Sequence, residues 1–245
     1  MESEAVHSFF NHPITVDEYT QAVHRVGLWD SERIVFMQAF EKEAIMLDLG
    51  CGAGRIAFGL KALGYNDLIG VDPAENMIAN ARAINDAEGH GILFEVGDAT
   101  QLHFEEARFG GVIFGFNGLM QIPKREQRQK AMKEVFRVLK PGGAFVFTSH
   151  DREMAQRSKY WKKERKAWDN GNQQVCLDDF GDVAVETEGG MHFIHAPTQA
   201  EINSDLGRVG FKVEETLFRS QIASEKPQVR EFADECRFWI ARKQG

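Results

Sequence analysis

The chain has 245 residues, of which 43% are hydrophobic and 27% charged, and its formal net charge is −8. The length suits one large α/β domain, and a mean hydropathy of −0.37 without a long apolar run argues against a membrane span. An acidic surface repels phosphates, which disfavours bulk nucleic-acid binding. Residues 1–12 lack the pattern of a signal peptide. Cys51, Cys176 and Cys236 fit neither a zinc spacing nor a disulfide framework, so we expect a cytoplasmic protein without a metal.

Two helices are expected before the first strand. Residues 15–26 place apolar side chains on one helical face and stop at Gly27. Thr15, followed three positions later by Glu18, matches the capping-box pattern. Ser31 is a candidate cap for a second helix. The apolar face of that helix would carry Ile34, Met37 and Phe40.

From residue 44 the pattern alternates between short apolar runs and amphipathic helices. Strands are predicted at residues 44–49, 67–71, 92–96, 112–116 and 144–149. Helices are predicted after the first strand as far as Leu63, and at residues 74–87 and 125–139. Such alternation implies right-handed crossovers and a mostly parallel sheet covered on both faces.

After Ser149 the alternation stops. Residues 151–169 are expected to form a helix, and residues 182–187 and 191–195 a hairpin around Gly189-Gly190. A helix capped by Thr198 and Glu201 and two final strands, 211–218 and 236–242, complete the chain.

The predicted fold is a doubly wound, mostly parallel, seven-stranded Rossmann-like α/β sheet with N-terminal helices and a helix-plus-hairpin insertion. It divides into an N-terminal helical cap, a cofactor-binding core, an insertion expected to cover the pocket and select the substrate, and the C-terminal strands. These segments are residues 1–43, 44–150, 151–197 and 198–245.

A glycine-rich loop, Asp48-Leu49-Gly50-Cys51-Gly52-Ala53-Gly54, joins the first strand to the next helix. Glycines allow a sharp turn and a close approach of a ligand to the backbone, and the following helix offers free N–H groups. In an open parallel sheet, ligands bind at the carboxyl ends of the strands. We therefore expect a cofactor at this loop.

Polar side chains follow the other strand ends. Asp72 ends the second strand, 22 positions after Gly50, where a carboxylate can accept both hydroxyls of a ribose. Asp98 follows the third strand and could accept from an adenine amino group. Asn117 follows the fourth strand and His150 the fifth. Together with Asp48, these residues are predicted to surround one rim of the sheet.

This set resembles the class I S-adenosylmethionine-dependent methyltransferases. The resemblance covers residues 44–147 and rests on Asp48–Gly54, Val71-Asp72, Gly97-Asp98-Ala99, residues 114–122 and residues 137–143. It implies methyl transfer from S-adenosylmethionine, with the methionine part held by Gly50, Gly52 and Gly54, the ribose by Asp72 and the adenine by Asp98. The cofactor set is completed by Asp48, Cys51, Ala99, Phe116 and Asn117. Candidate catalytic residues are His150, Asn117 and Gln121.

Other functions remain open at this point. Gly52 to Ala57 also matches the dinucleotide pattern GxGxxA, with Asp72 at 20 positions from Gly52, as in a nicotinamide-dependent oxidoreductase. Asp48 and Gly50 before that pattern, and Asp98 after the third strand, favour the methyl donor. The chain could also be a non-catalytic cofactor-binding subunit. The expected acceptor is a small molecule, with RNA or protein as the second choice.

Several conspicuous side chains have structural interpretations. Residues 152–168 mix basic and aromatic side chains, for which an amphipathic helix with a solvated basic face is favoured over RNA binding or contact with an anionic substrate group. His192 and His195, in the hairpin, are expected to be solvated or structural. Tyr19 and Trp29 are expected to pack in the core of the N-terminal helices.

Overall fold

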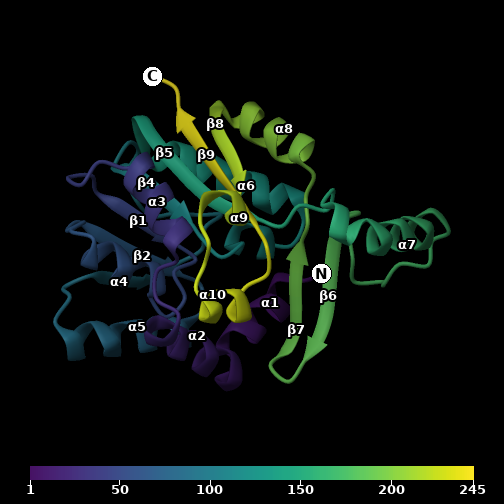
Figure 1. Ribbon diagram of the computed structural model, residues 1–245, viewed down its shortest axis with the longest axis horizontal. Helices are drawn as coiled ribbons and strands as arrows, with labels where there is room; N and C mark the ends of the chain where they lie inside the picture. The colour runs from purple at the N-terminus through teal and green to yellow at the C-terminus, as the bar shows by residue number, and fades with distance from the viewer.

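The computed structural model describes residues 1–245. Its centre is a seven-stranded sheet in the order β3-β2-β1-β4-β5-β9-β8 (Figure 1). The strands are β1 Met46–Leu49, β2 Leu68–Asp72, β3 Leu93–Val96, β4 Phe109–Phe114, β5 Leu139–Ser149, β8 Phe211–Phe218 and β9 Arg237–Lys243. Strands β1 to β5 pair in parallel, and β9 is antiparallel to both of its neighbours. The predicted fold class is confirmed.

Helices cover both faces of this sheet. The helices are α3 Asp30–Ala39, α4 Arg55–Ala62, α5 Glu75–Glu88, α6 Arg125–Val138 and α8 Gln199–Val209. Met46 of β1 belongs to one apolar core together with side chains from α3, α4 and α5. Its neighbour Leu47 belongs to the second core, with α6 and α8. Because successive side chains of a strand point to opposite faces, a sheet buried on both faces needs the continuous apolar runs seen in the sequence.

The start of the chain forms two further helices, α1 Ser3–Asn11 and α2 Pro13–Arg25. The sequence did not indicate α1. The predicted capping box of Thr15 and Glu18 is wrong, because the helix begins at Pro13 and His12 accepts the N–H of Ile14. Thr15 is instead buried inside the first turn. Proline supplies the helical φ at the first position and has no N–H to satisfy, so the helix starts two residues earlier than expected.

Helix α3 also differs from its prediction. Ser31 lies inside the helix, and Glu32 accepts the backbone N–H of Trp29 at the N-cap. Ile34 and Met37 are 38% and 50% exposed. The buried side is formed by Val35, Phe36 and Ala39, with Phe40 buried just after the helix. Ile34 and Met37 of the predicted apolar face are therefore on the outside of the helix, whereas Phe40 is buried as predicted.

Two boundaries shift near the centre of the chain. The fourth strand ends at Phe114, so Phe116 lies in the loop that leads to the short helix η1 Gly118–Gln121. Helix α6 ends at Val138, and β5 already begins at Leu139 and runs through the Pro-Gly-Gly segment. Residues 109–114 of β4 pair with that longer strand.

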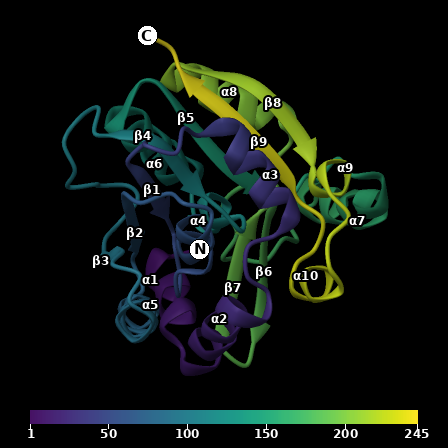
Figure 2. The same ribbon diagram turned by 60° about the vertical axis from the view of Figure 1, so that its left-hand side comes forward.

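The insertion consists of η2 Ala155–Arg157, α7 Ser158–Asp169 and a separate hairpin, β6 Asp182–Thr187 with β7 Gly190–His195. Only residues 158–169 of the expected helix 151–169 are α-helical, and Asp151, in the loop before η2, accepts a hydrogen bond from Arg237. Helix α7 projects from one end of the molecule in both views (Figures 1 and 2). Two short helices between β8 and β9, α9 Arg219–Ile222 and α10 Pro227–Phe232, were not predicted. No helix is long and apolar enough to cross a membrane.

Candidate functional site

A cavity with an empty volume of about 730 Å³ lies at the carboxyl ends of the parallel strands, and we call it the loop cavity. Its polar lining includes Gly50, Gly52, Asp72, Asp98 and Gln121, and its apolar lining includes Phe10, Tyr19, Met77, Ala99, Phe114 and Phe116. The predicted strand-end residues Asp72 and Asp98 thus border one cavity with the glycine loop.

The glycine loop has a backbone that only glycine adopts easily. Gly50 and Gly52 have φ of +65° and +53°, in the left-handed region. A Cβ atom at Gly50 would lie 2.5 Å from the ring of Phe114. The loop is attached to β2, because Gly50 donates to the Val71 carbonyl at 2.7 Å and Gly52 donates to Asp72 Oδ2 at 2.9 Å.

Asp72 is buried at the end of β2 and accepts two backbone N–H bonds. Its second partner is Ala74, whose N–H lies 2.9 Å from Oδ1. Burial raises the pKa of Asp72 to about 6 against the lowering effect of these two bonds. Asp98 is exposed and accepts the N–H of Thr100 at 2.7 Å. Each carboxylate keeps free lone pairs for hydroxyl or amino donors of a ligand.

Asp48 lies beneath the loop rather than on the rim of the loop cavity. It borders a smaller adjoining cavity, together with Cys51 and Arg55. One oxygen accepts the N–H of Ala57 at 3.1 Å, while Oδ1 is buried without a partner. Burial raises the pKa of Asp48 to about 8 although Arg55 opposes it. Gly54 borders neither cavity and forms the N-cap of α4 with a φ of +93°.

A second, larger cavity adjoins the first, and we call it the hairpin cavity because β6 and β7 form one of its sides. Tyr19, Phe116 and Gln121 border both cavities and so form their shared wall. The lining of the hairpin cavity also includes Phe9, Glu18, Asn117, His150, Glu188, His192, Arg230, Glu231, Phe232 and Asp234. Two of the three candidate catalytic residues, Asn117 and His150, therefore line the hairpin cavity only.

Asn117 is held in an uncommon conformation. It has φ of +60° and follows Phe116 at +47°, and left-handed residues other than glycine are rare enough to suggest a functional constraint. Its N–H donates to Thr148 Oγ1 at 2.7 Å, which fixes the turn against β5. Its side-chain Oδ1 is buried without a hydrogen-bond partner. Because buried polar atoms are nearly always paired, this oxygen is a candidate ligand contact.

Two histidines border the hairpin cavity. His150 Nδ1 lies 3.0 Å from the Glu235 carbonyl, an acceptor, so this nitrogen carries the proton and the neutral ring has its lone pair on Nε2. His192 stacks on Phe9 with ring centroids 5.0 Å apart. Burial lowers the pKa of both rings, and for His192 the charge of His150 adds to that effect.

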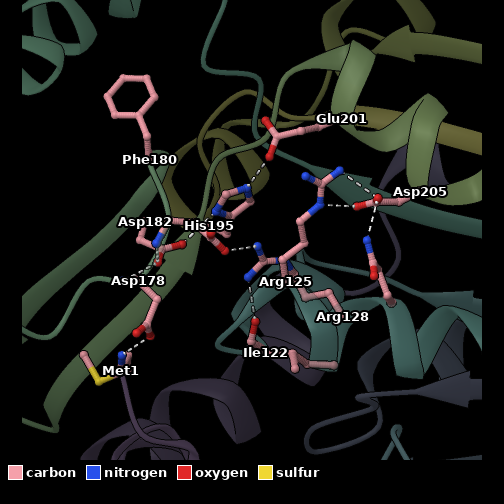
Figure 3. Close-up of polar contacts among 12 residues, drawn as sticks. Met1, Ile122, Arg125, Arg128, Asp178, Phe180, Asp182, His195, Glu201 and Asp205 are labelled. Atoms are coloured by element: carbon pink, nitrogen blue, oxygen red, sulfur yellow. Dashed lines mark hydrogen bonds and ion pairs between the residues drawn. The ribbon is translucent and has the colours of Figure 1, made fainter. Parts of the chain in front are cut away.

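The sequence interpretation missed His192 and the contribution of α10. In the hairpin, His192 pairs with Val185 and Ile194 with Val183, so these residues share one face. That face points to the cavity, which His192 and Ile194 both line. His195 is on the opposite face, where it lies between Asp182 and Glu201 (Figure 3). Alternation along residues 191–195 was the available signal, but it does not say which face meets the cavity.

Trp29 and the residues of α7 lie away from both cavities. Trp29 is buried in the core, as expected, and contacts Phe116 edge to face. No residue of α7 lines either cavity. Trp161 and Trp168 of α7 pack against Phe180, with centroids 5.7 and 6.0 Å apart. The basic side chains of that helix are exposed, in agreement with an amphipathic helix.

Residues 46–143 match the family model of the methyltransferase domain. A demethylmenaquinone methyltransferase of Leptospira interrogans is 42% identical over 105 residues, which are 41% of this chain and 41% of that protein. The chain thus matches less than half the length of this relative.

Solved structures share the fold over a longer stretch. An S-adenosylmethionine-dependent methyltransferase of Methanosarcina mazei superposes with a TM-score of 0.69 at 21% identity, covering 86% of this chain and 97% of that one. The cyclase SpnF superposes at 0.60 and 16% identity, covering 93% and 80%, so the fold alone does not determine the reaction. Residues 46–143 therefore match the methyltransferase domain, and the solved structures show that the chain shares the fold of a methyltransferase over most of its length.

Proposed function

We propose that the protein is an S-adenosylmethionine-dependent methyltransferase that acts on a small-molecule acceptor. The observation that carries this proposal is the shared wall of Tyr19, Phe116 and Gln121. The loop cavity on one side is bordered mostly by the matched methyltransferase segment, and the hairpin cavity on the other side mostly by parts of the chain outside it. A donor and an acceptor in these two cavities would meet at that wall.

The residues of the loop cavity fit S-adenosylmethionine. Asp72 and Asp98 offer carboxylate oxygens for the ribose hydroxyls and the adenine amino group. The unpaired, buried Oδ1 of Asp48 is an acceptor that the cationic amino group of the methionine part would satisfy through the adjoining cavity. Gly50, Cys51 and Gly52 keep the backbone around this part free of larger side chains, and Ala99 and Phe116 complete the proposed cofactor lining. Gly54 and Asn117, which the sequence also assigned to the cofactor, lie outside these two cavities.

When bound, the cofactor supplies an electrophilic methyl group on a positively charged sulfur. The protein then needs mainly to orient the acceptor and to exclude water. The rings of Tyr19 and Phe116 at the shared wall offer electron-rich faces to positive charge. Asn117, Gln121 and His150 are the polar side chains that can hold the acceptor or take its proton.

The experiment that tests this function is calorimetry followed by a transfer assay. S-adenosylmethionine and its demethylated product should bind the pure protein, whereas NAD should not bind comparably. Labelled methyl donor incubated with a metabolite extract, and separately with bulk RNA, should label a small molecule. Tight NAD binding without a response to S-adenosylmethionine would point to an oxidoreductase, and binding without transfer by the isolated chain to a cofactor-binding subunit.

We further propose that residues 151–197 act as a substrate-selecting lid and residues 1–43 as a helical cap on the core. Thr187, Glu188, Gly189, His192 and Ile194 of the insertion border the hairpin cavity. Val6 and Phe10 of α1 border the loop cavity. The two segments therefore close the two cavities from outside the sheet.

A further inference from the structure

The mouth of the hairpin cavity is acidic. Glu18, Glu188 and Glu231 border it, are exposed and belong to no ion pair in the structure. A fourth acid, Asp234, is neutralised by Arg157 at 2.7 Å. Arg230 is the single arginine or lysine among the residues that line the cavity. The excess of unpaired carboxylates attracts cations and repels anions.

The inner wall of this cavity is aromatic. The rings of Phe116 and Phe232 stack with centroids 4.8 Å apart, and Tyr19 meets Phe116 edge to face at 5.8 Å. The stacked faces of Phe116 and Phe232 cover each other, so it is the outer faces of these rings that can attract a desolvated cation, by about 1–2 kcal/mol. The acidic mouth and the aromatic wall therefore both favour a cationic ligand.

The buried Oδ1 of Asn117 supplies an independent indication. Asn117 is 8% exposed, lines the hairpin cavity, and its amide oxygen has no donor within the protein. The left-handed backbone and the bond to Thr148 hold the residue in place. A ligand that donates a hydrogen bond from inside the cavity would satisfy this oxygen.

We propose that the methyl acceptor is a primary or secondary amine, which donates an N–H to Asn117 Oδ1 and gives its excess proton to His150 Nε2. This assignment of the acceptor class rests on the proposed function. An amine enters as an ammonium ion. Its positive charge is attracted by the acidic mouth and by the aromatic wall, and its N–H groups can donate to the unpaired amide oxygen of Asn117. A neutral alcohol could donate a hydrogen bond to the amide oxygen, but it carries no positive charge that the mouth or the wall would attract.

Atoms and charge are conserved in the proposed step. The ammonium ion loses one proton to His150 Nε2, which leaves a lone pair on nitrogen. That pair forms the new N–CH₃ bond while the C–S bond breaks and its electron pair stays on sulfur. The products are a methylated ammonium ion, a neutral thioether and a protonated imidazole, which returns its proton to water. Burial lowers the pKa of His150, so the ring is neutral at neutral pH and its Nε2 lone pair is unprotonated.

The first test measures binding without turnover. Protein saturated with S-adenosylhomocysteine is titrated with 2-phenylethylamine and, separately, with 2-phenylethanol, which differ only in the terminal group. We expect the amine to bind at least tenfold more tightly, with an advantage that shrinks as salt is added. Equal affinity, or tighter binding of the alcohol, would overturn the amine assignment. Failure of S-adenosylhomocysteine itself to bind would instead overturn the proposed function.

Substitutions at the cavity test which residues contact the amine. The triple variant Glu18→Gln, Glu188→Gln, Glu231→Gln should lose at least tenfold in amine affinity and little in alcohol affinity. Glu186→Gln is the matched control, because Glu186 is exposed on the opposite face of the same hairpin. Asn117→Gly, which suits the left-handed backbone, should lose tenfold, and Asn117→Asp should retain amine binding. An unchanged amine affinity in the triple variant and in Asn117→Gly would contradict the proposal.

The second test locates the transferred methyl group. Products of a metabolite extract incubated with labelled donor should carry the label on nitrogen. Label on oxygen, sulfur or carbon alone, or no labelled product from protein that binds the donor, would overturn the proposal. His150→Gln should slow label incorporation at least 100-fold while 2-phenylethylamine affinity stays within threefold. His192→Gln should slow it less than tenfold, and the reverse order would overturn the assignment of His150.

Discussion

Asp72 combines a structural role with a position at the ligand cavity. Its oxygens accept the N–H groups of Ala74, just before α5, and of Gly52 in the loop. The same carboxylate borders the loop cavity. A residue that closes the loop and faces the ligand affects stability as well as binding. A change at Asp72 is therefore expected to lower the unfolding midpoint more than a purely ligand-binding residue would.

Replacing Asp72 with asparagine should weaken S-adenosylhomocysteine binding roughly ten- to hundred-fold, or about 1.5–3 kcal/mol, because a charged acceptor is lost. The pKa of Asp72 is raised to about 6, so the carboxylate is ionised above that pH and protonated below it. Wild-type affinity should therefore fall between pH 7 and pH 5, and the variant should show no such fall. Calorimetry over this range measures both effects. Unchanged binding with lower stability would leave Asp72 a structural residue.

A buried ion network joins the insertion to α8 (Figure 3). His195 Nδ1 lies 2.7 Å from Asp182 Oδ1 and Nε2 lies 3.2 Å from Glu201 Oε1. Arg152 donates to Glu201 as well. Glu201 also completes the capping box with Thr198, so one carboxylate stabilises the helix start and holds the hairpin beside it.

This network predicts a defined acid sensitivity. Burial raises the pKa of Glu201, but the bonds from His195 and Thr198 and the charge of Arg152 hold it at about 2. Because the folded-state pKa is depressed, the stabilisation is complete above about pH 4.5 and is lost as the pH falls through about 2. Glu201→Gln should lower the free energy of unfolding by about 2–3 kcal/mol at pH 7. Urea unfolding at several pH values should show the two proteins converging near pH 2, and a constant difference would contradict the linkage.

Elements that are marked by a short sequence pattern could be predicted, and elements without such a pattern could not. The capping box at Thr198 and the Gly189-Gly190 turn are short-range patterns, and both elements are present. Helix α10 spans six residues and is too short to show periodicity. For the site, Asp72 and Asp98 were placed because strand ends converge at one edge of a parallel sheet. His192 was missed because its position depends on how the hairpin packs against α1, which no local pattern encodes.

The insertion leaves and re-enters the sheet domain at one place. The N–H of Arg152 donates to the Pro197 carbonyl at 3.1 Å, and its guanidinium donates to the Ala196 carbonyl at 2.9 Å. Asp151 is held by Arg237 of β9. Both ends of the insertion are therefore fixed, and the hairpin and α7 extend from that base in different directions (Figure 2). The hairpin borders the proposed acceptor site, and α7 does not.

This arrangement predicts that substrate affects the two parts of the insertion differently. Lids are less stable locally than the sheet they cover, so ligand contact should suppress their opening. Cofactor plus acceptor should slow amide exchange in residues 182–195 at least tenfold more than cofactor alone. Exchange in α7 should change little, which makes that helix an internal control within the same insertion. Hydrogen exchange read by mass spectrometry resolves the two segments. Equal slowing in both would indicate ordering of the entire insertion, and indifference of the hairpin to acceptor would make the insertion structural and move the acceptor contacts to α2 and α10.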